Sequence, residues 1–174
     1  MGKVDDKQAL KEWRAYYENL KKDTAVDELS PLERTKKLEY LEKHPVEWVK
    51  FFFPKYAKSK FMPFHIKAIN RICSNSEWYE VLSWSRELAK STITMMCVMY
   101  LVCTGKKRNT LLISSTKDNA IRLLDPYKEA FEQNSLLKAY YGDMREIGSW
   151  AKDEFSLTNG AAFRALGAGE SPRG

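Results

Sequence analysis

One segment of the sequence combines the residue types that bind a phosphate chain. From Leu82 to Ile93 the sequence LSWSRELAKSTI runs from apolar residues through a polar turn into an apolar stretch. In a P-loop, amides at a helix N-terminus face the β-phosphate, a lysine neutralises phosphate oxygens, and the next hydroxyl holds Mg²⁺. Lys90 and Ser91 match the last two tasks, so the segment predicts a site for ATP with Mg²⁺.

The glycines of the plain P-loop pattern are absent from this segment. In GxxxxGK[ST] the first glycine position is occupied by Trp84 and the second by Ala89. A Lys-Ser pair is also common at the start of a helix, where it serves only as a solvated cap. The pattern alone therefore leaves both interpretations open.

The phosphate hypothesis requires a strand before the turn and a helix after it. Residues 78–84, WYEVLSW, predict a strand, residues 90–104 an apolar helix, and residues 110–114 a second strand. A strand, a crossover helix and a second strand form a βαβ unit, which favours a parallel sheet covered by helices. The expected fold class is α/β.

Three helices are expected in an N-terminal segment covering residues 1–60. The first, over residues 7–22, carries a stripe of apolar residues at steps of three and four. Ser30 and Glu33 match a capping box at the start of the second. Pro45 ends that helix and begins the third.

A basic and aromatic stretch closes this segment, KFFFPKYAKSKF at residues 50–61. Alternating lysine and aromatic residues are found on surfaces that bind nucleic acids. Apolar residues at helical spacing more often form core. We favour the packing interpretation, in which Phe51, Phe52 and Phe53 point inward and the lysines remain in solvent.

The rest of the sequence predicts further helices and one hairpin. Asn159-Gly160 between two short apolar runs is a signal for a two-residue β-turn. Helices are expected at residues 64–72, from residue 117 onward with a kink or interruption at Pro126, and at residues 135–141; residues 167–174 have the composition of a loop.

Composition excludes several classes of protein. The 174 residues include 29 Lys+Arg and 23 Asp+Glu, a net charge of +6, which fits a globular domain. The longest apolar stretch, residues 93–103, is too short to span a bilayer, and the acidic N-terminus does not match a secretory signal. Three cysteines without a CxxC pair predict buried, reduced thiols, and neither histidine has zinc-site spacing.

Taken together, these motifs resemble the ATPase domain of the large terminase subunit of tailed bacteriophages. The resemblance rests on the order of SRELAKST at residues 85–92, LLISST at residues 111–116, and FSLTNGAAFRALGAGESPRG at residues 155–174. It covers roughly residue 63 to the C-terminus. It implies that residues 61–174 form an incomplete P-loop NTPase of the ASCE type.

The resemblance also implies a biological role. Terminases are ATP-driven motors that thread double-stranded viral DNA into a procapsid in the host cytoplasm. The implied partners are therefore viral DNA, a portal protein, a small terminase subunit and further copies of the chain in a ring, with no membrane.

The resemblance assigns roles to individual residues. Arg86 matches an arginine that acts in cis on the γ-phosphate, together with Lys90; the alternative is a surface arginine that pairs with Glu87 or another acid. Phe64 and His65 match a segment that contacts adenine, although Phe64 also fits a core stripe. Ser91 is the Mg²⁺ ligand. The implied nucleotide-binding residues in the turn are Ser85, Arg86, Glu87, Leu88, Ala89, Lys90, Ser91 and Thr92.

Hydrolysis also needs an acidic pair at the end of an apolar strand, and none is found in the sequence. In terminases this Walker B strand follows an Arg-Gly pair such as Arg173-Gly174, where the sequence stops. We therefore expect the front part of an ATPase domain, without the nuclease domain, with an exposed sheet edge and no useful ATPase activity alone. The alternatives are a fragment of another P-loop DNA translocase or helicase, and a non-enzymatic basic α/β module that binds nucleic acid.

Overall fold

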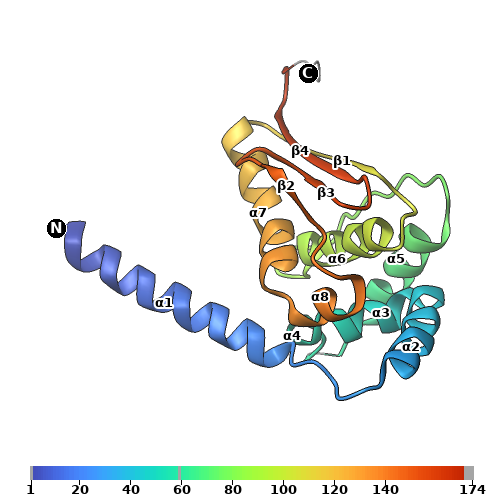
Figure 1. Ribbon diagram of the computed structural model, residues 1–174. Coiled ribbons are helices and arrows are strands. Elements are labelled where there is room, and N and C mark those ends of the chain that lie inside the picture. Colours follow the sequence, from blue (N-terminus) through green and yellow to red (C-terminus); the bar gives the residue numbers. More distant parts are fainter. Residues whose placement is uncertain (1, 59, 171–174) are drawn as a thin grey trace.

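Helices dominate the computed structural model, which describes residues 2–58 and 60–170 (Figure 1). Every predicted helix is present, and α7 continues through Pro126 without an interruption. The short helix α4 was not predicted. In chain order the elements are α1 (Gly2–Asp23), α2 (Pro31–Lys43), α3 (Pro45–Phe52), α4 (Pro54–Ala57), α5 (Pro63–Ser74), α6 (Lys90–Cys103), β1 (Asn109–Ser114), α7 (Lys117–Gln133), α8 (Ser135–Tyr141), β2 (Arg145–Trp150), β3 (Glu154–Leu157) and β4 (Ala162–Gly167).

The fold is α/β, with a small mixed sheet flanked by helices. The strand order is β1-β4-β3-β2. Only β1 and β4 pair in parallel, whereas β3 is antiparallel to both β4 and β2. The expectation of a parallel sheet is therefore wrong, because three of the four strands, β2, β3 and β4, form an antiparallel meander.

The strand predicted at residues 78–84 does not form. Its burial still alternates with a period of two, since Glu80, Leu82 and Trp84 are half-buried while Val81 and Ser83 are exposed. Strand propensity favours an extended backbone, but a β-strand also requires a neighbour for its amides and carbonyls. Among the described residues this segment has no such neighbour, so the expected βαβ unit is not completed, and β1 pairs with β4 instead.

The hairpin around Asn159-Gly160 forms at the predicted place with a longer loop. The Leu157 amide donates to the Ala161 carbonyl at 2.7 Å, which leaves three residues in the loop. Of the three residues in this loop, only Gly160 has a positive φ, 79°. A type I′ turn would need two such residues, so the loop is instead a turn followed by a left-handed glycine.

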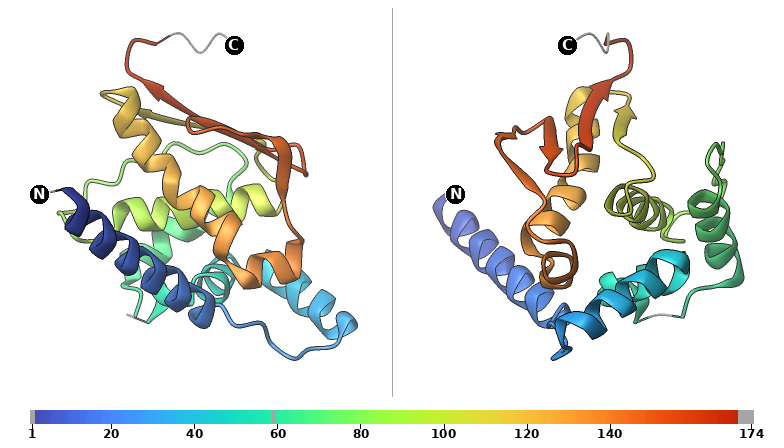
Figure 2. Two further views of the ribbon diagram at one scale, coloured as in Figure 1. Left: turned by 60° about the vertical axis from the view of Figure 1, so that its left-hand side comes forward. Right: turned by 45° about the vertical axis from the view of Figure 1, so that its right-hand side comes forward.

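The core is organised around α6, which lies between the sheet and α3 (Figure 2). α6 is buried nearly all round, and Trp48 of α3 packs edge-on against its Tyr100, with ring centroids 5.4 Å apart. One hydrophobic cluster joins these helices to Phe163 of β4. Residues from the N-terminal segment and from the sheet thus share a core.

The basic and aromatic stretch at residues 50–61 follows the packing interpretation. Phe52 and Phe53 are buried and Phe51 packs against the core cluster. Lys58 pairs with Asp23 at 2.8 Å. The Lys55 ammonium lies over a ring of α1, whose N-terminal half projects away from the other helices (Figure 1).

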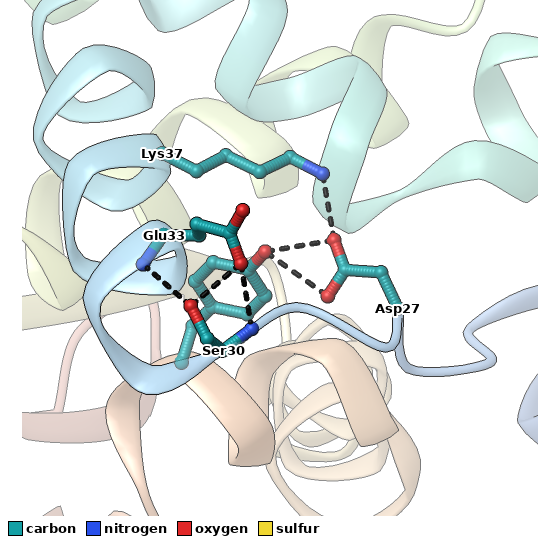
Figure 3. Close-up of polar contacts among 5 residues, drawn as sticks. Asp27, Ser30, Glu33 and Lys37 are labelled. Carbon is teal, nitrogen blue, oxygen red and sulfur yellow. Dashed lines mark hydrogen bonds and ion pairs between the residues drawn. The ribbon is translucent and has the colours of Figure 1, made fainter.

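The chain between α1 and α2 is fixed by two polar groups of residues (Figure 3). At the start of α2 the predicted capping box is present: the Glu33 amide donates to Ser30 Oγ at 3.4 Å, and the Ser30 amide donates to Glu33 Oε2 at 3.0 Å. Beside it, Asp27 accepts hydrogen bonds from Lys37 Nζ at 2.7 Å and from the Tyr140 hydroxyl at 2.9 Å.

Two other sequence-based expectations can be compared with the structure. Cys73, Cys97 and Cys103 are free and buried, as predicted. In the described part of the chain, the helices are too short or too polar to cross a bilayer. Of the loop predicted at residues 167–174, Gly167 instead ends β4 and residues 168–170 are outside any helix or strand, while residues 171–174 lie outside the described residues.

Candidate phosphate-binding turn and pocket

The turn before α6 has an unusual backbone for residues that carry a Cβ atom. Glu87 and Ala89 have φ of 67° and 54°. This left-handed region disfavours side chains by about 1–2 kcal/mol per residue, so glycine is usual there. Ala89 is the position of the second glycine in the plain P-loop pattern. Ala89 thus adopts a backbone conformation that is usual for glycine.

The N-terminus of α6 has no side-chain cap. Ala89 is the N-cap residue, and its methyl side chain cannot accept a hydrogen bond from the helix amides. By contrast, the side chains of Ser30 and Thr116 cap α2 and α7. The first amides of a helix have no partner inside it and carry the positive end of the helix dipole. A left-handed residue followed by right-handed ones also directs successive amides into a concavity that suits an anion. This terminus can therefore receive a phosphate.

Lys90 closes over the turn that precedes it. Its Nζ donates to the carbonyls of Trp84 and of Ser85, the second at 2.8 Å. An ammonium group has three donors, so one remains for a ligand. The lysine thus braces the turn and can also bind an anion without leaving its carbonyl partners.

The turn is attached to α5 by His65 and two aromatic rings. The Met62 amide donates to His65 Nδ1 at 3.3 Å, which assigns the proton to Nε2, and Nε2 donates to the Leu88 carbonyl at 3.2 Å. Phe64 lies edge-on to Trp84 with ring centroids 4.9 Å apart. Phe64 and His65 thus hold the turn in place, and the adenine contact that the resemblance implied stays a prediction.

A pocket of about 430 Å³ lies beside the start of α6, between α6, α7 and the residues before the turn. Its volume is within the usual range for small-ligand sites. Burial raises the pKa of the Tyr56 and Tyr127 phenols, so both stay protonated at neutral pH. The lining residues are Tyr56, Glu80, Leu82, Lys90, Ser91, Thr92, Thr94, Met95, Leu112, Arg122, Leu123, Pro126 and Tyr127.

The pocket brings together only part of the predicted site. Lys90, Ser91 and Thr92 line it, but Phe64, His65 and the turn residues 85–89 do not. The side chains of residues 85–89 are exposed, so they do not fill the turn. The polar groups of the candidate site are therefore the three residues at the start of α6 and the amides that precede them.

Arg86 is exposed and has neither an ion pair nor a hydrogen bond within residues 2–58 and 60–170. Pairing with Glu87, the alternative considered from the sequence, does not occur.

Thr116 caps α7 by accepting from the Asn119 amide at 3.3 Å, and Ser115 accepts from the Asn119 side chain. Neither hydroxyl reaches the pocket.

Sequence reasoning missed two charged residues that line the pocket, Glu80 and Arg122. Glu80 is bound by Arg71 and by Trp78 Nε1, the latter at 2.5 Å. A carboxylate inside the apolar run WYEVLSW was a signal, because such a group needs a partner. Nothing in the sequence distinguishes Arg122 from other exposed arginines.

The described residues include no group of three or more His, Cys, Asp or Glu side chains that could hold a metal ion. The Ser91 hydroxyl is the one Mg²⁺ ligand that the sequence predicted at this site. Comparison with models of known protein families and with curated protein sequences finds no match for this chain.

Proposed function

We propose that the turn at residues 85–92 binds the phosphate chain of ATP with Mg²⁺. We further propose that the protein is the ATP-binding part of a viral terminase large subunit, the motor that packages double-stranded DNA. The observation that carries the first proposal is the uncapped N-terminus of α6, preceded by left-handed Ala89 and adjoined by a pocket that Lys90 and Ser91 line.

The chemistry of these groups suits a phosphate chain. The free amides and the third donor of Lys90 supply hydrogen bonds to phosphate oxygens, and charge-assisted bonds of this kind are stronger than neutral ones. Ser91 would supply a hydroxyl ligand for Mg²⁺, and the ion would neutralise negative charge on the phosphates. Arg86 is exposed and has no ion pair in the described chain, and its proposed role is to contact the γ-phosphate.

A binding assay with a fluorescent ATP analogue and Mg²⁺ tests the phosphate proposal. Lys90→Ala should weaken binding at least tenfold, because it removes the charge and the brace across the turn. Lys36→Ala on α2, an exposed lysine outside the pocket, serves as the control and should bind as the wild type does. Circular dichroism should be the same for all three proteins. Equal binding by the wild type and Lys90→Ala would contradict the proposal.

The terminase proposal needs a separate test. The motif order predicts that the genomic sequence after codon 174 encodes an apolar strand that ends in two carboxylates. Such a strand would support an ATPase motor. Its absence, with ATP binding intact, would favour a different P-loop protein, and absence of ATP binding would favour a basic α/β module.

A further inference from the structure

The pocket beside α6 contains a second cation that the proposed function does not use. Arg122 projects from α7 into the lining that also contains Lys90, Ser91 and Thr92. The pocket's one carboxylate, Glu80, is already neutralised by Arg71. The pocket therefore presents positive charge to a ligand from two helices, through Lys90 of α6 and Arg122 of α7.

Arg122 has no partner among the described residues, although partners stand at suitable spacings on its own helix. Asp118 and Asp125 lie four residues before and three residues after it, which are the separations at which helix ion pairs form. Neither carboxylate pairs with it. By contrast, Arg71 and Arg145 both pair with nearby acids. The guanidinium of Arg122 is thus left free at the pocket.

We infer that Arg122 binds the phosphate chain from the side opposite Lys90, an inference that rests on the proposed function. A guanidinium presents a planar fork of donors that matches two phosphate oxygens at once. Lys90 and the α6 amides would hold the chain at one end of the pocket, and Arg122 would hold it across the pocket. The occupant is then a ligand with an extended polyphosphate, and the nucleoside is not what Arg122 recognises.

Titration calorimetry with Mg·ATP and with inorganic tripolyphosphate tests this assignment. Arg122→Gln should weaken binding of both ligands by about tenfold, as expected for loss of one charge-assisted contact of about 1.4 kcal/mol. Arg122→Lys should recover part of that loss. Arg108→Gln, an exposed arginine outside the pocket, is the matched control and should bind as the wild type does.

The possible outcomes separate the inference from the proposed function. If wild type binds both ligands and Arg122→Gln binds them equally well, the inference is wrong while the phosphate turn stands. A loss seen with ATP alone would assign Arg122 to the nucleoside and also overturn it. If wild type binds neither ligand, the proposed function fails and the inference falls with it. Thermal unfolding should be the same for all variants, because Arg122 has no structural partner in the described chain.

Discussion

The N-termini of α2 and α6 show two opposite ways to begin a helix. At α2, Ser30 and Glu33 satisfy each other's amides, and Pro31, which has no N–H and so needs no acceptor, takes the first helical position. At α6, left-handed Ala89 precedes the helix, and no side chain of the described residues caps the first-turn amides. The first arrangement stabilises a surface helix, whereas the second leaves donors free at a pocket.

This difference between the two helix starts indicates that the start of α6 is the less stable one. A capping side chain contributes about 1 kcal/mol, and a left-handed residue with a Cβ costs a similar amount. The start of α6 lacks a capping side chain, and the turn before it contains two left-handed residues, Glu87 and Ala89. Burial of α6 in the core compensates, because a helix that is apolar nearly all round is held by packing rather than by its ends. Strain of this kind is often found at binding sites.

The largest expected effect comes from changing Ala89 itself. Ala89→Gly should raise the free energy of unfolding by about 1 kcal/mol and keep nucleotide binding, because glycine adopts φ of 54° without strain. Ala89→Val should lower it by about 1–2 kcal/mol and weaken binding, since a β-branched residue resists that conformation. Chemical denaturation measures the stabilities. A stabilising Ala89→Val would mean that the left-handed turn is not what the protein adopts.

A smaller effect is expected at the closed terminus. Ser30→Ala should lower the free energy of unfolding by about 1 kcal/mol, because the Glu33 amide loses its acceptor and the capping box is broken. Nucleotide affinity should stay within twofold of the wild type. A marked loss of affinity in Ser30→Ala would show that the two helix termini are coupled, contrary to the comparison.

The smallest effect concerns Asp27, beside the α2 cap. Partial burial alone would raise the pKa of Asp27, but hydrogen bonds from Lys37 and Tyr140 and the positive charges of Lys37 and Arg34 lower it on balance from its ordinary 3.8. Burial, together with the hydrogen bond to Asp27 and the charge of that carboxylate, raises the pKa of Tyr140 to about 12. A depressed carboxyl pKa stabilises the fold above the unfolded-state pKa and loses that contribution as the pH falls through the folded-state pKa.

Asp27→Asn should therefore cost about 0.5 kcal/mol at pH 7, an amount typical of a part-exposed ion pair. The difference from the wild type should shrink as the pH is lowered below 3.8. Urea unfolding at several pH values checks this expectation. A difference that is independent of pH would assign the effect to the shape of the side chain rather than to its charge.

Local signals predicted the helices because each has its own periodicity and boundary residues. Ser30 with Glu33 and Pro45 fixed two helix starts from sequence alone. The sheet was harder, because pairing depends on neighbours that lie far away in the sequence. Residues 78–84 have strand propensity but no partner, and β2 (Arg145–Trp150) lacks a clear alternation in its sequence. Its Gly148, with φ of 86°, also weakens any strand signal.

The candidate site was predictable to the extent that it is local. Lys90, Ser91 and Thr92 share one helical turn, so their proximity follows from the sequence. The position of Arg122 follows from the packing of α7 beside α6, and that of Glu80 from its ion pair with Arg71 of α5. No short motif encodes either. The backbone of Ala89 could be anticipated only from its place in the P-loop pattern, since alanine gives no signal for a positive φ.

The central claim is that the amides at the start of α6 receive the phosphate chain. An amide-resolved NMR titration with Mg·ATP tests it, with the α2 terminus as an internal reference. The account predicts large shift changes for the amides of residues 88–92 and little change for those of residues 32–34. Unchanged amides at residues 88–92, with shifts confined to surface lysines elsewhere, would contradict it.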